Sequence, residues 1–264
     1  MRIPSFPIAV AARAAAEAGD EALAAHPPTA PEAPPVVLVV GLRHHARVEA
    51  ANPAALAAGV RPGVHTAARA RTYAADLRCL PWDDELIERA SLACTAQLLE
   101  RTPAVTCAAP GRFWVDASGQ ERHGGEPALA RRLGDALRDA GYPDVRVALA
   151  GSVVAAEVAT TLDGPALRVL APDPAPPPGH GEDAAFLAPL SLARLPLPDD
   201  LREVLALLGL TTIGALADLD AASLEVRFGA TGLRARDRAR GLDPRGPLCL
   251  GGPPASRGVI RSRL

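Results

Sequence analysis

A proline-dense segment divides this sequence into two parts that cannot belong to one continuous helix or strand. The stretch APDPAPPPGHGED, residues 171–183, contains five prolines in thirteen residues. Proline has no amide hydrogen to donate, and its ring fixes φ, so neither helices nor sheets tolerate such a run. The segment is therefore interpreted as an extended linker. The parts before and after it are expected to fold as separate domains.

Before this linker, apolar segments typical of strands alternate with amphipathic helical segments. VVLVVGL, residues 36–42, is predicted as a buried strand, and DDELIERASLACTAQLLERT, residues 83–102, as a long helix with acidic residues in its first turn. The opening stretch IPSFPIAV, residues 3–10, is predicted as another short strand. This alternation predicts an α/β (α+β) domain with a mixed sheet over residues 1–170.

After the linker, the sequence pattern is helical. Residues 184–247 contain L-x-x-L-G-L-x-T-x-G-x-L-A-x-L, followed by L-x-x-R-F-G-x-x-G. These patterns are typical of a small domain with helix-hairpin-helix units. A glycine-containing hairpin can direct backbone amides at a DNA phosphate without contacting a base. The alternative is a helical pair that only packs on the sheet domain. Residues 248–264 are expected to form a flexible tail.

The second hairpin also carries a local excess of positive charge. Between Arg227 and Arg245 there are six arginines and only two aspartates. Such an excess is typical of a surface that faces phosphates, although a solvated helix face would show it as well. The candidate DNA-binding residues are Arg227, Gly229, Gly232, Arg234 and Arg236.

Composition narrows the remaining function classes. The net charge of -2 indicates neither a nucleic-acid nor a membrane partner, and no apolar run approaches the ~20 residues of a membrane-spanning helix. All 28 basic residues are arginine, which excludes mechanisms that need a lysine. The four cysteines show no zinc-ligand spacing, so they are interpreted as reduced thiols of a cytoplasmic protein.

The order of these segments resembles the Y-family translesion DNA polymerases, and within them the ImuB-like (UmuC-type) proteins of bacterial mutasome cassettes. The resemblance covers residues 1–247 and rests on IPSFPIAV, RVEAANPAALAAGVRPGVHTAARA, GRFWVDAS and LLGLTTIGALADL with RFGATG. It implies a palm-like mixed sheet with helices, small fingers and a helical thumb. It also implies phosphoryl transfer by two Mg²⁺ ions that carboxylates hold.

The carboxylates that this chemistry needs are missing from the matched positions. The acidic residue of the family's first strand matches Arg2, and the family's paired acidic residues match Gly111 and Arg112. Asp116 lies beyond that pair and is expected to be structural rather than a metal ligand. No catalytic residue and no cofactor are therefore expected. Mg²⁺ would be required only if the chain were an active polymerase.

The groups that bind the incoming nucleotide differ as well. The tyrosine and arginine of the family's fingers helix match Pro53 and Leu56, and the position of the aromatic residue that excludes ribonucleotides falls near Pro7. A palm lysine that contacts the phosphates matches Glu157, which reverses the charge. The helix stop at Gly59 is kept. The joint loss of the metal-binding acids and of the groups that bind the nucleotide predicts a polymerase-like fold without polymerase chemistry.

The leading hypothesis is a catalytically inactive Y-family-like protein of DNA damage tolerance. It would act as an adaptor or as a weak, sequence-independent DNA-binding module, with a mutasome polymerase or a RecA-like protein as a further partner and no membrane contact. After the thumb the family has a little finger. The final segment PLCLGGPPASRGVIRSRL is expected to be too short to form one, so a weak duplex grip is expected. The alternatives are an active error-prone translesion polymerase and a truncated relative with no independent role.

Overall fold

A computed structural model describes most of the chain before residue 246. The described residues are 1–26, 28–30, 32–42, 45–119, 124–170, 181, 183–243 and 245. Most of the predicted linker at 171–183 and the whole predicted tail at 248–264 lie outside them. The described residues divide into two compact units: an N-terminal unit of residues 3–113 and 135–145, and a C-terminal unit of residues 1–2, 114–134 and 146–245. The domain boundaries expected at 170, 183 and 247 stay predictions.

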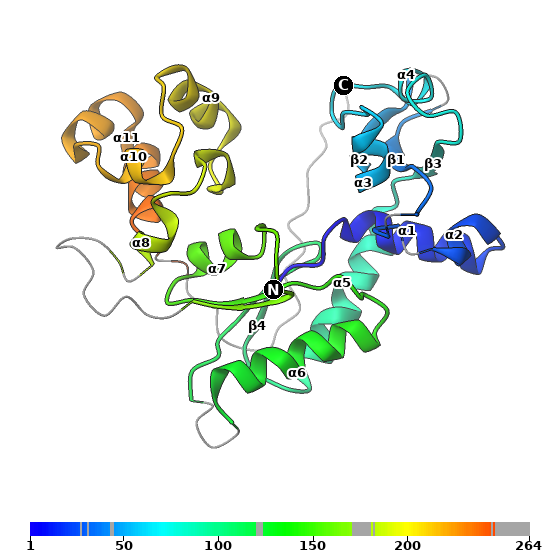
Figure 1. The fold of residues 1–264 in the computed structure, drawn as a ribbon, viewed down its shortest axis with the longest axis horizontal. Helices are drawn as coiled ribbons and strands as arrows, with labels where there is room; N and C mark the ends of the chain where they lie inside the picture. The colour runs from blue at the N-terminus through cyan, green and yellow to red at the C-terminus, as the bar shows by residue number, and fades with distance from the viewer. Residues whose placement is uncertain are drawn as a thin grey trace. The chain divides into compact units, whose positions relative to one another are not determined.

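The N-terminal unit contains a three-stranded mixed sheet (Figure 1). Its strands, in the order β2-β1-β3, are β2 (Arg47–Ala51), β1 (Val36–Val40) and β3 (Arg78–Pro81). β1 runs antiparallel to β2 and parallel to β3. The strand predicted at 36–42 is confirmed, and its first three residues are fully buried because side chains of the unit cover both faces.

Helices cover this sheet and extend from it. They are α1 (Phe6–Glu17), α2 (Glu21–Ala25), α3 (Pro53–Ala57), α4 (Ala67–Ala70) and α5 (Asp84–Leu99). Buried residues of α1 pack against Val36 and Leu38 of β1. The strand predicted over residues 3–10 is wrong, because α1 begins at Phe6. Ser5 turns the chain with a φ of 51°, and an alanine-rich run then continues the helix.

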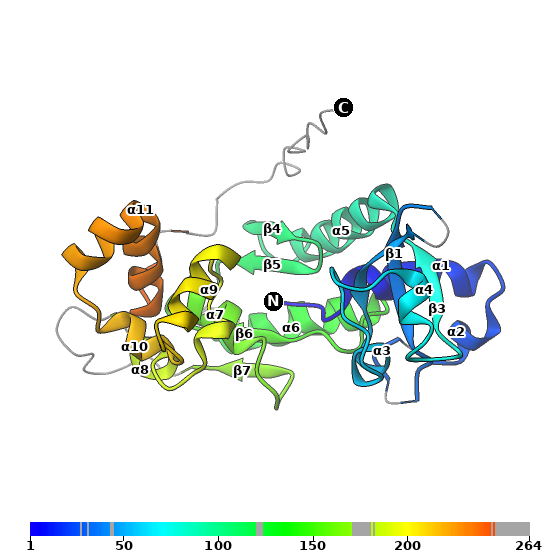
Figure 2. The same cartoon turned by 90° about the horizontal axis from the view of Figure 1, so that it is seen from above.

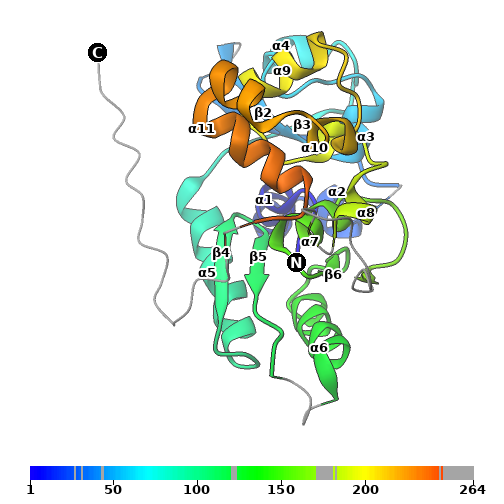
Figure 3. The ribbon, with the colours of Figure 1, turned by 90° about the vertical axis from the view of Figure 1, so that its left-hand side faces the viewer.

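A tight hairpin follows α5. Its strands are β4 (Val105–Ala109) and β5 (Arg112–Val115), and β4 lies beside α5 (Figure 3). The turn predicted at Pro110–Gly111 is confirmed, with a φ of 72° at Gly111. The next element is α6 (Gly125–Asp139). In α5, burial raises the pKa of the Cys94 thiol to about 11, so this thiol stays protonated near neutral pH.

The C-terminal unit combines a small parallel sheet with helices (Figure 2). Its elements are β6 (Val147–Leu149), α7 (Val153–Ala159), β7 (Leu167–Val169), α8 (Ala184–Leu187), the 3-10 helix η3 (Leu192–Arg194), α9 (Asp199–Leu207), α10 (Ile213–Ala217) and α11 (Ala221–Ala239). Val154 and Val158 of α7 share one buried core with Leu187, Leu205 and Ile213. The predicted fold class, a mixed α/β architecture followed by a helical region, is confirmed. No helix within the described residues has the length and apolarity to cross a membrane.

Candidate palm site and hairpin surface

Gly111, which matches one of the family's paired acidic residues, lies where no side chain fits. Its φ of 72° is in the left-handed region, which strains residues other than glycine. A Cβ atom there would lie 2.8 Å from Cγ of Phe6 and 3.1 Å from the carbonyl oxygen of Ile3. The amide of Ile3 also donates a hydrogen bond to the Gly111 carbonyl at 2.7 Å. A carboxylate at this position would therefore require the backbone or Phe6 to move.

The other matched positions are occupied by cations or by a residue with a local role. Arg112 is exposed in β5. The backbone of Arg2 exchanges two hydrogen bonds of 2.8 Å with Arg146. Asp116 accepts a hydrogen bond from the amide of Ser118 at 2.9 Å, which closes a short turn. The part of the chain that the structure describes holds no cluster of three or more His, Cys, Asp or Glu residues that could hold a metal ion.

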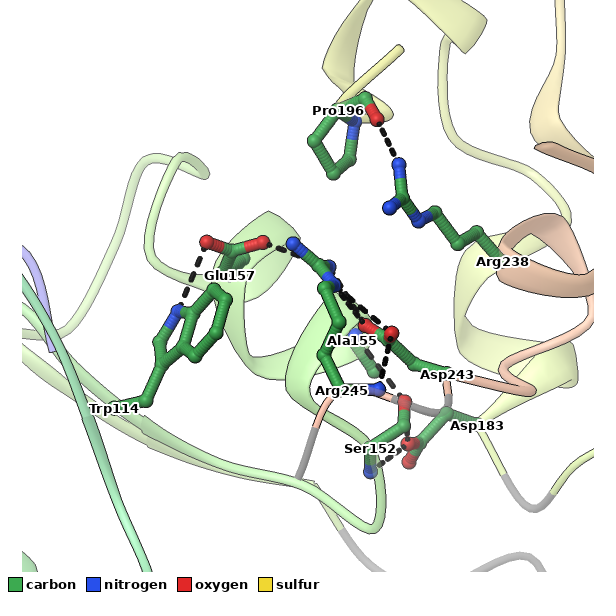
Figure 4. A network of polar contacts seen from close by, with 9 residues as sticks. All are labelled: Trp114, Ser152, Ala155, Glu157, Asp183, Pro196, Arg238, Asp243 and Arg245. Atoms are coloured by element: carbon green, nitrogen blue, oxygen red, sulfur yellow. Dashed lines mark hydrogen bonds and ion pairs between the residues drawn. The ribbon is translucent and has the colours of Figure 1, made fainter. Parts of the chain in front are cut away.

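Glu157, which matches the family's palm lysine, belongs to a closed polar network in the C-terminal unit (Figure 4). Its carboxylate accepts the indole N–H of Trp114 at 3.0 Å and a guanidinium N–H of Arg245 at 3.2 Å. Arg245 also donates to Asp243 at 2.6 Å, and its guanidinium lies 4.9 Å from the centre of the Trp114 ring. The reversed charge at Glu157 is thus compensated within the unit.

Burial and neighbouring charges shift the pKa values of the two arginines in this region, Arg245 and Arg238. Burial by itself lowers the pKa of Arg245, but the hydrogen bonds and charges of Asp243 and Glu157 outweigh it, so the pKa is raised. Burial, followed by the charge of Arg245, lowers the pKa of Arg238, which donates to the Pro196 carbonyl at 2.9 Å. Glu157 therefore has a fixed cationic partner in Arg245 and belongs to the framework of the unit.

A second polar cluster fixes the start of α7, the helix that carries Glu157 (Figure 4). The hydroxyl of Ser152 accepts from the amide of Ala155 at 3.3 Å and donates to Asp183 at 2.6 Å. Asp183 is buried and also accepts from the amides of Gly151 and Ser152. Because its oxygens are satisfied in this way, Asp183 ties the N-terminus of α7 to the start of α8.

Helix α3 begins at a buried asparagine and ends before a glycine. Asn52 is fully buried: its side-chain oxygen accepts from Val36 and Ala55, and its amide donates to two carbonyls. Pro53 occupies the first turn of α3, and Leu56 is exposed. The predicted helix stop is confirmed, because Gly59 follows α3 with a φ of 98°.

The candidate DNA-binding residues fall into two groups. Gly229, with φ 57° and ψ -151°, interrupts α11, and Arg227 and Arg234 are exposed on either side of it. Gly232 is buried, and a Cβ atom there would lie 2.7 Å from Cβ of Phe228. Arg236 is partly buried and donates to the Leu219 carbonyl at 2.6 Å. Arg227 and Arg234 are thus accessible to a ligand, whereas Gly232 packs the two parts of α11 together and Arg236 ties α11 to the segment before it.

Sequence reasoning identified Glu157 but not its partners. Trp114 lies in the matched palm segment, yet nothing in its spacing indicates an indole hydrogen bond to α7. Asp243 and Arg245 form a short Asp-x-Arg pair within the basic segment, and nothing in its spacing indicates a contact with α7. Because 88 residues separate Glu157 from Arg245, no local pattern could connect them.

Comparisons with known proteins identify the family and the fold of the chain. Residues 22–161, which are 140 of the 264 residues, match the model of the impB/mucB/samB family. The chain belongs to this family. It is 34% identical over 149 residues to DNA polymerase IV of Caulobacter vibrioides, covering 54% of this chain and 35% of that protein. It is 31% identical over 134 residues to DNA polymerase IV of Dehalococcoides mccartyi, covering 50% and 33%.

Solved structures show the same fold over most of the chain. DinB from Sulfolobus solfataricus superposes with a TM-score of 0.68 at 18% identity, covering 92% of this chain and 66% of that one. An insertion ternary complex of Dbh DNA polymerase gives 0.67 at 19% identity, covering 91% and 67%. The chain spans about a third of the length of its curated relatives. The likeness to Y-family polymerases is confirmed for family and fold, and the ImuB-like branch stays a prediction.

Proposed function

We propose that this chain is a catalytically inactive, ImuB-like member of its family that serves DNA damage tolerance by binding rather than by synthesis. The observation that carries the proposal is the packing at Gly111. Where a metal-binding carboxylate would stand, Phe6 and the Ile3 carbonyl leave no space for a side chain. If the acid had been lost by a single substitution alone, putting it back would restore the metal site. At Gly111 the packing closes the position, so putting an acid back would not restore it.

Electrostatics support the same proposal. Two Mg²⁺ ions bring a charge of +4 into a small volume, and oxygen ligands normally compensate it. The matched positions offer two cations, Arg2 and Arg112, and a glycine, so these residues do not fit a two-metal centre. On the triphosphate side, Pro53 and Leu56 cannot donate charged hydrogen bonds, and Glu157 is held by Trp114 and Arg245. No catalytic step is derived from this set.

The binding role rests on the hairpin in α11. Arg227 and Arg234 are exposed beside the helix restart at Gly229, where backbone amides and two cations can meet phosphates. Several of the similar solved structures are described as Dbh complexes, one of them a post-insertion binary complex. The proposed contact is weak and independent of sequence, since phosphates carry no base information. The proposed protein partner of this adaptor is a mutasome polymerase or a RecA-like protein.

An active error-prone polymerase is the second candidate function. The observation that favours it is the 34% identity to a DNA polymerase IV over 149 residues. In that case acids outside the matched positions would have to hold the metal ions, and Asp116 would be the first to test.

Primer extension separates the two candidates. We expect the purified chain to incorporate no nucleotide on any primed template, in Mg²⁺ or in Mn²⁺, because arginines occupy two of the three matched metal positions and a glycine occupies the third. The measurement is gel-resolved extension with a Y-family polymerase as the positive control. Extension that disappears in Asp116→Ala would show that Asp116 is a metal ligand and would overturn the proposal. Extension that survives this substitution would require acids elsewhere in the chain or a contaminating enzyme.

Duplex binding tests the hairpin surface. If Arg227 and Arg234 each contact one phosphate, the double variant Arg227→Ala, Arg234→Ala should weaken binding and flatten the log–log salt dependence by about two. Fluorescence anisotropy with labelled duplexes over a salt series measures this slope. Arg131→Ala with Arg132→Ala is the matched control, because it also removes two exposed arginines from the C-terminal unit. Equal slopes for both double variants would place the contact elsewhere.

A further inference from the structure

The N-terminal unit carries a pair of stacked rings beside the short helix α4, one partly buried (His65) and one exposed (Tyr73). The rings of His65 and Tyr73 lie 4.9 Å apart between centroids at an interplanar angle of 10°. The guanidinium of Arg69 lies 5.8 Å from the centre of the Tyr73 ring. Tyr73 is 41% exposed, although an aromatic side chain of this size is more often covered. The name α4 patch is used below for His65 and Tyr73 together with the arginines Arg47, Arg61, Arg69 and Arg71.

Backbone contacts hold this ring pair in place. The ring nitrogen Nδ1 of His65 accepts the amide N–H of Arg61 at 3.2 Å, and the His65 carbonyl accepts from Val48 at 3.0 Å. At Gly59 a Cβ atom would lie 3.2 Å from the Tyr73 ring, so the glycine allows the ring to approach the backbone. The stack is therefore fixed before any ligand arrives, which reduces the entropy lost on binding.

The charge around the rings has one predominant sign. Between residues 47 and 76 there are four arginines, all in the α4 patch and all exposed, and the only acidic residues are Glu49 and Asp76. Arg47 donates to the carbonyl of Gly63 at 2.7 Å. No carboxylate of the described residues forms an ion pair with any of these four arginines. Their charges are thus available to an anionic ligand.

We propose that the α4 patch binds single-stranded DNA, with an unpaired base stacked on the His65–Tyr73 pair and the neighbouring phosphates on the arginines. A ring pair fixed within a group of cations matches the two parts of a nucleotide, an apolar base face and a charged backbone. A duplex offers only its phosphates, because its base faces are stacked on one another. This inference rests on the proposed DNA contact but concerns another unit and another form of DNA.

The test compares two labelled single strands of equal length and charge: an oligothymidylate, and the same backbone with abasic sites. The wild-type chain should bind the oligothymidylate at least about fivefold more tightly, because only this strand can stack. Tyr73→Ala should remove that preference and leave the affinity for the abasic strand unchanged. Tyr73→Phe keeps the ring and should retain the preference. Arg61→Ala with Arg71→Ala should weaken binding of both strands and flatten the salt slope by about 1.4, because each phosphate contact on a single strand contributes about 0.7.

Each outcome decides the proposal. Equal wild-type affinity for the two strands overturns it without any variant, so a variant that fails to fold cannot leave the question open. A Tyr73→Ala protein that keeps the preference for thymidylate also overturns it. Arg227→Ala with Arg234→Ala should leave the preference between the strands unchanged, since those residues belong to the hairpin. A lost hairpin contact and a lost α4 patch can therefore be told apart.

Discussion

Gly111→Asp, the substitution that restores one matched acid, is expected to destabilise the protein by about 2–4 kcal/mol and to restore no polymerase activity. Strain at a φ of 72° contributes about 1 kcal/mol of this. Forcing side-chain atoms against Phe6 and the Ile3 carbonyl adds about 1–3 kcal/mol. Urea denaturation followed by circular dichroism measures the loss, and primer extension measures the activity.

Gly63→Asp is the matched control for this experiment. Gly63 lies in the same unit with a φ of 74°, but a Cβ atom there would have no neighbour within 4 Å. It therefore carries the backbone strain without the collision, and we expect a loss of about 1 kcal/mol. Equal losses at the two positions would show that space at Gly111 is not limiting. Polymerase activity in Gly111→Asp would show that the palm can still assemble a metal site.

Local sequence signals predicted those features of the fold that local chemistry determines. The apolar run at 36–42 became β1, because five consecutive apolar residues can be buried only where both faces of a sheet are covered. The stop at Gly59 and the turn at Gly111 were predictable because each requires a positive φ. None of these inferences needed a residue distant in sequence.

The errors arose where a distant contact decides the outcome. Residues 3–10 have the composition of a strand, yet Phe6 is drawn into the core of its unit and α1 begins there. The basic neighbours of Arg236 predict a phosphate contact, yet Arg236 donates to the Leu219 carbonyl, 17 residues away. Charge counting cannot separate an arginine that ties two segments together from one that faces solvent.

The network around Glu157 gives the second large expected effect. Arg245→Met should destabilise the C-terminal unit by about 2–4 kcal/mol, because it leaves two carboxylates without their cation. The side chain of Asp243 is 0% exposed and that of Glu157 is 16% exposed, so water cannot replace the guanidinium well. Arg245 itself is 27% exposed, which keeps the expected loss below that of a fully buried pair.

Two further variants distinguish charge from packing. Asp243→Asn combined with Arg245→Met removes the most deeply buried charge together with its partner, and should recover part of the loss. Arg138→Met, in the N-terminal unit, shows the cost of a surface pair: it breaks an ion pair whose aspartate is 65% exposed, and it should cost at most about 1 kcal/mol. A loss in Arg245→Met no larger than this control would show that the network adds little to stability.

The fluorescence of Trp114 reports locally on the network around Glu157. In a Trp82→Phe background its fluorescence reports only this site, because the chain has two tryptophans. Removing the guanidinium, 4.9 Å from the ring, should shift the emission before any unfolding occurs. Glu157→Lys, which restores the family's cation, should shift the emission in a similar way and should also lower stability. The carboxylate that now accepts from Trp114 and Arg245 would be replaced by a cation beside the Arg245 guanidinium. Unchanged emission in both variants would mean that the indole does not sense Arg245, and the network would then not be closed in solution.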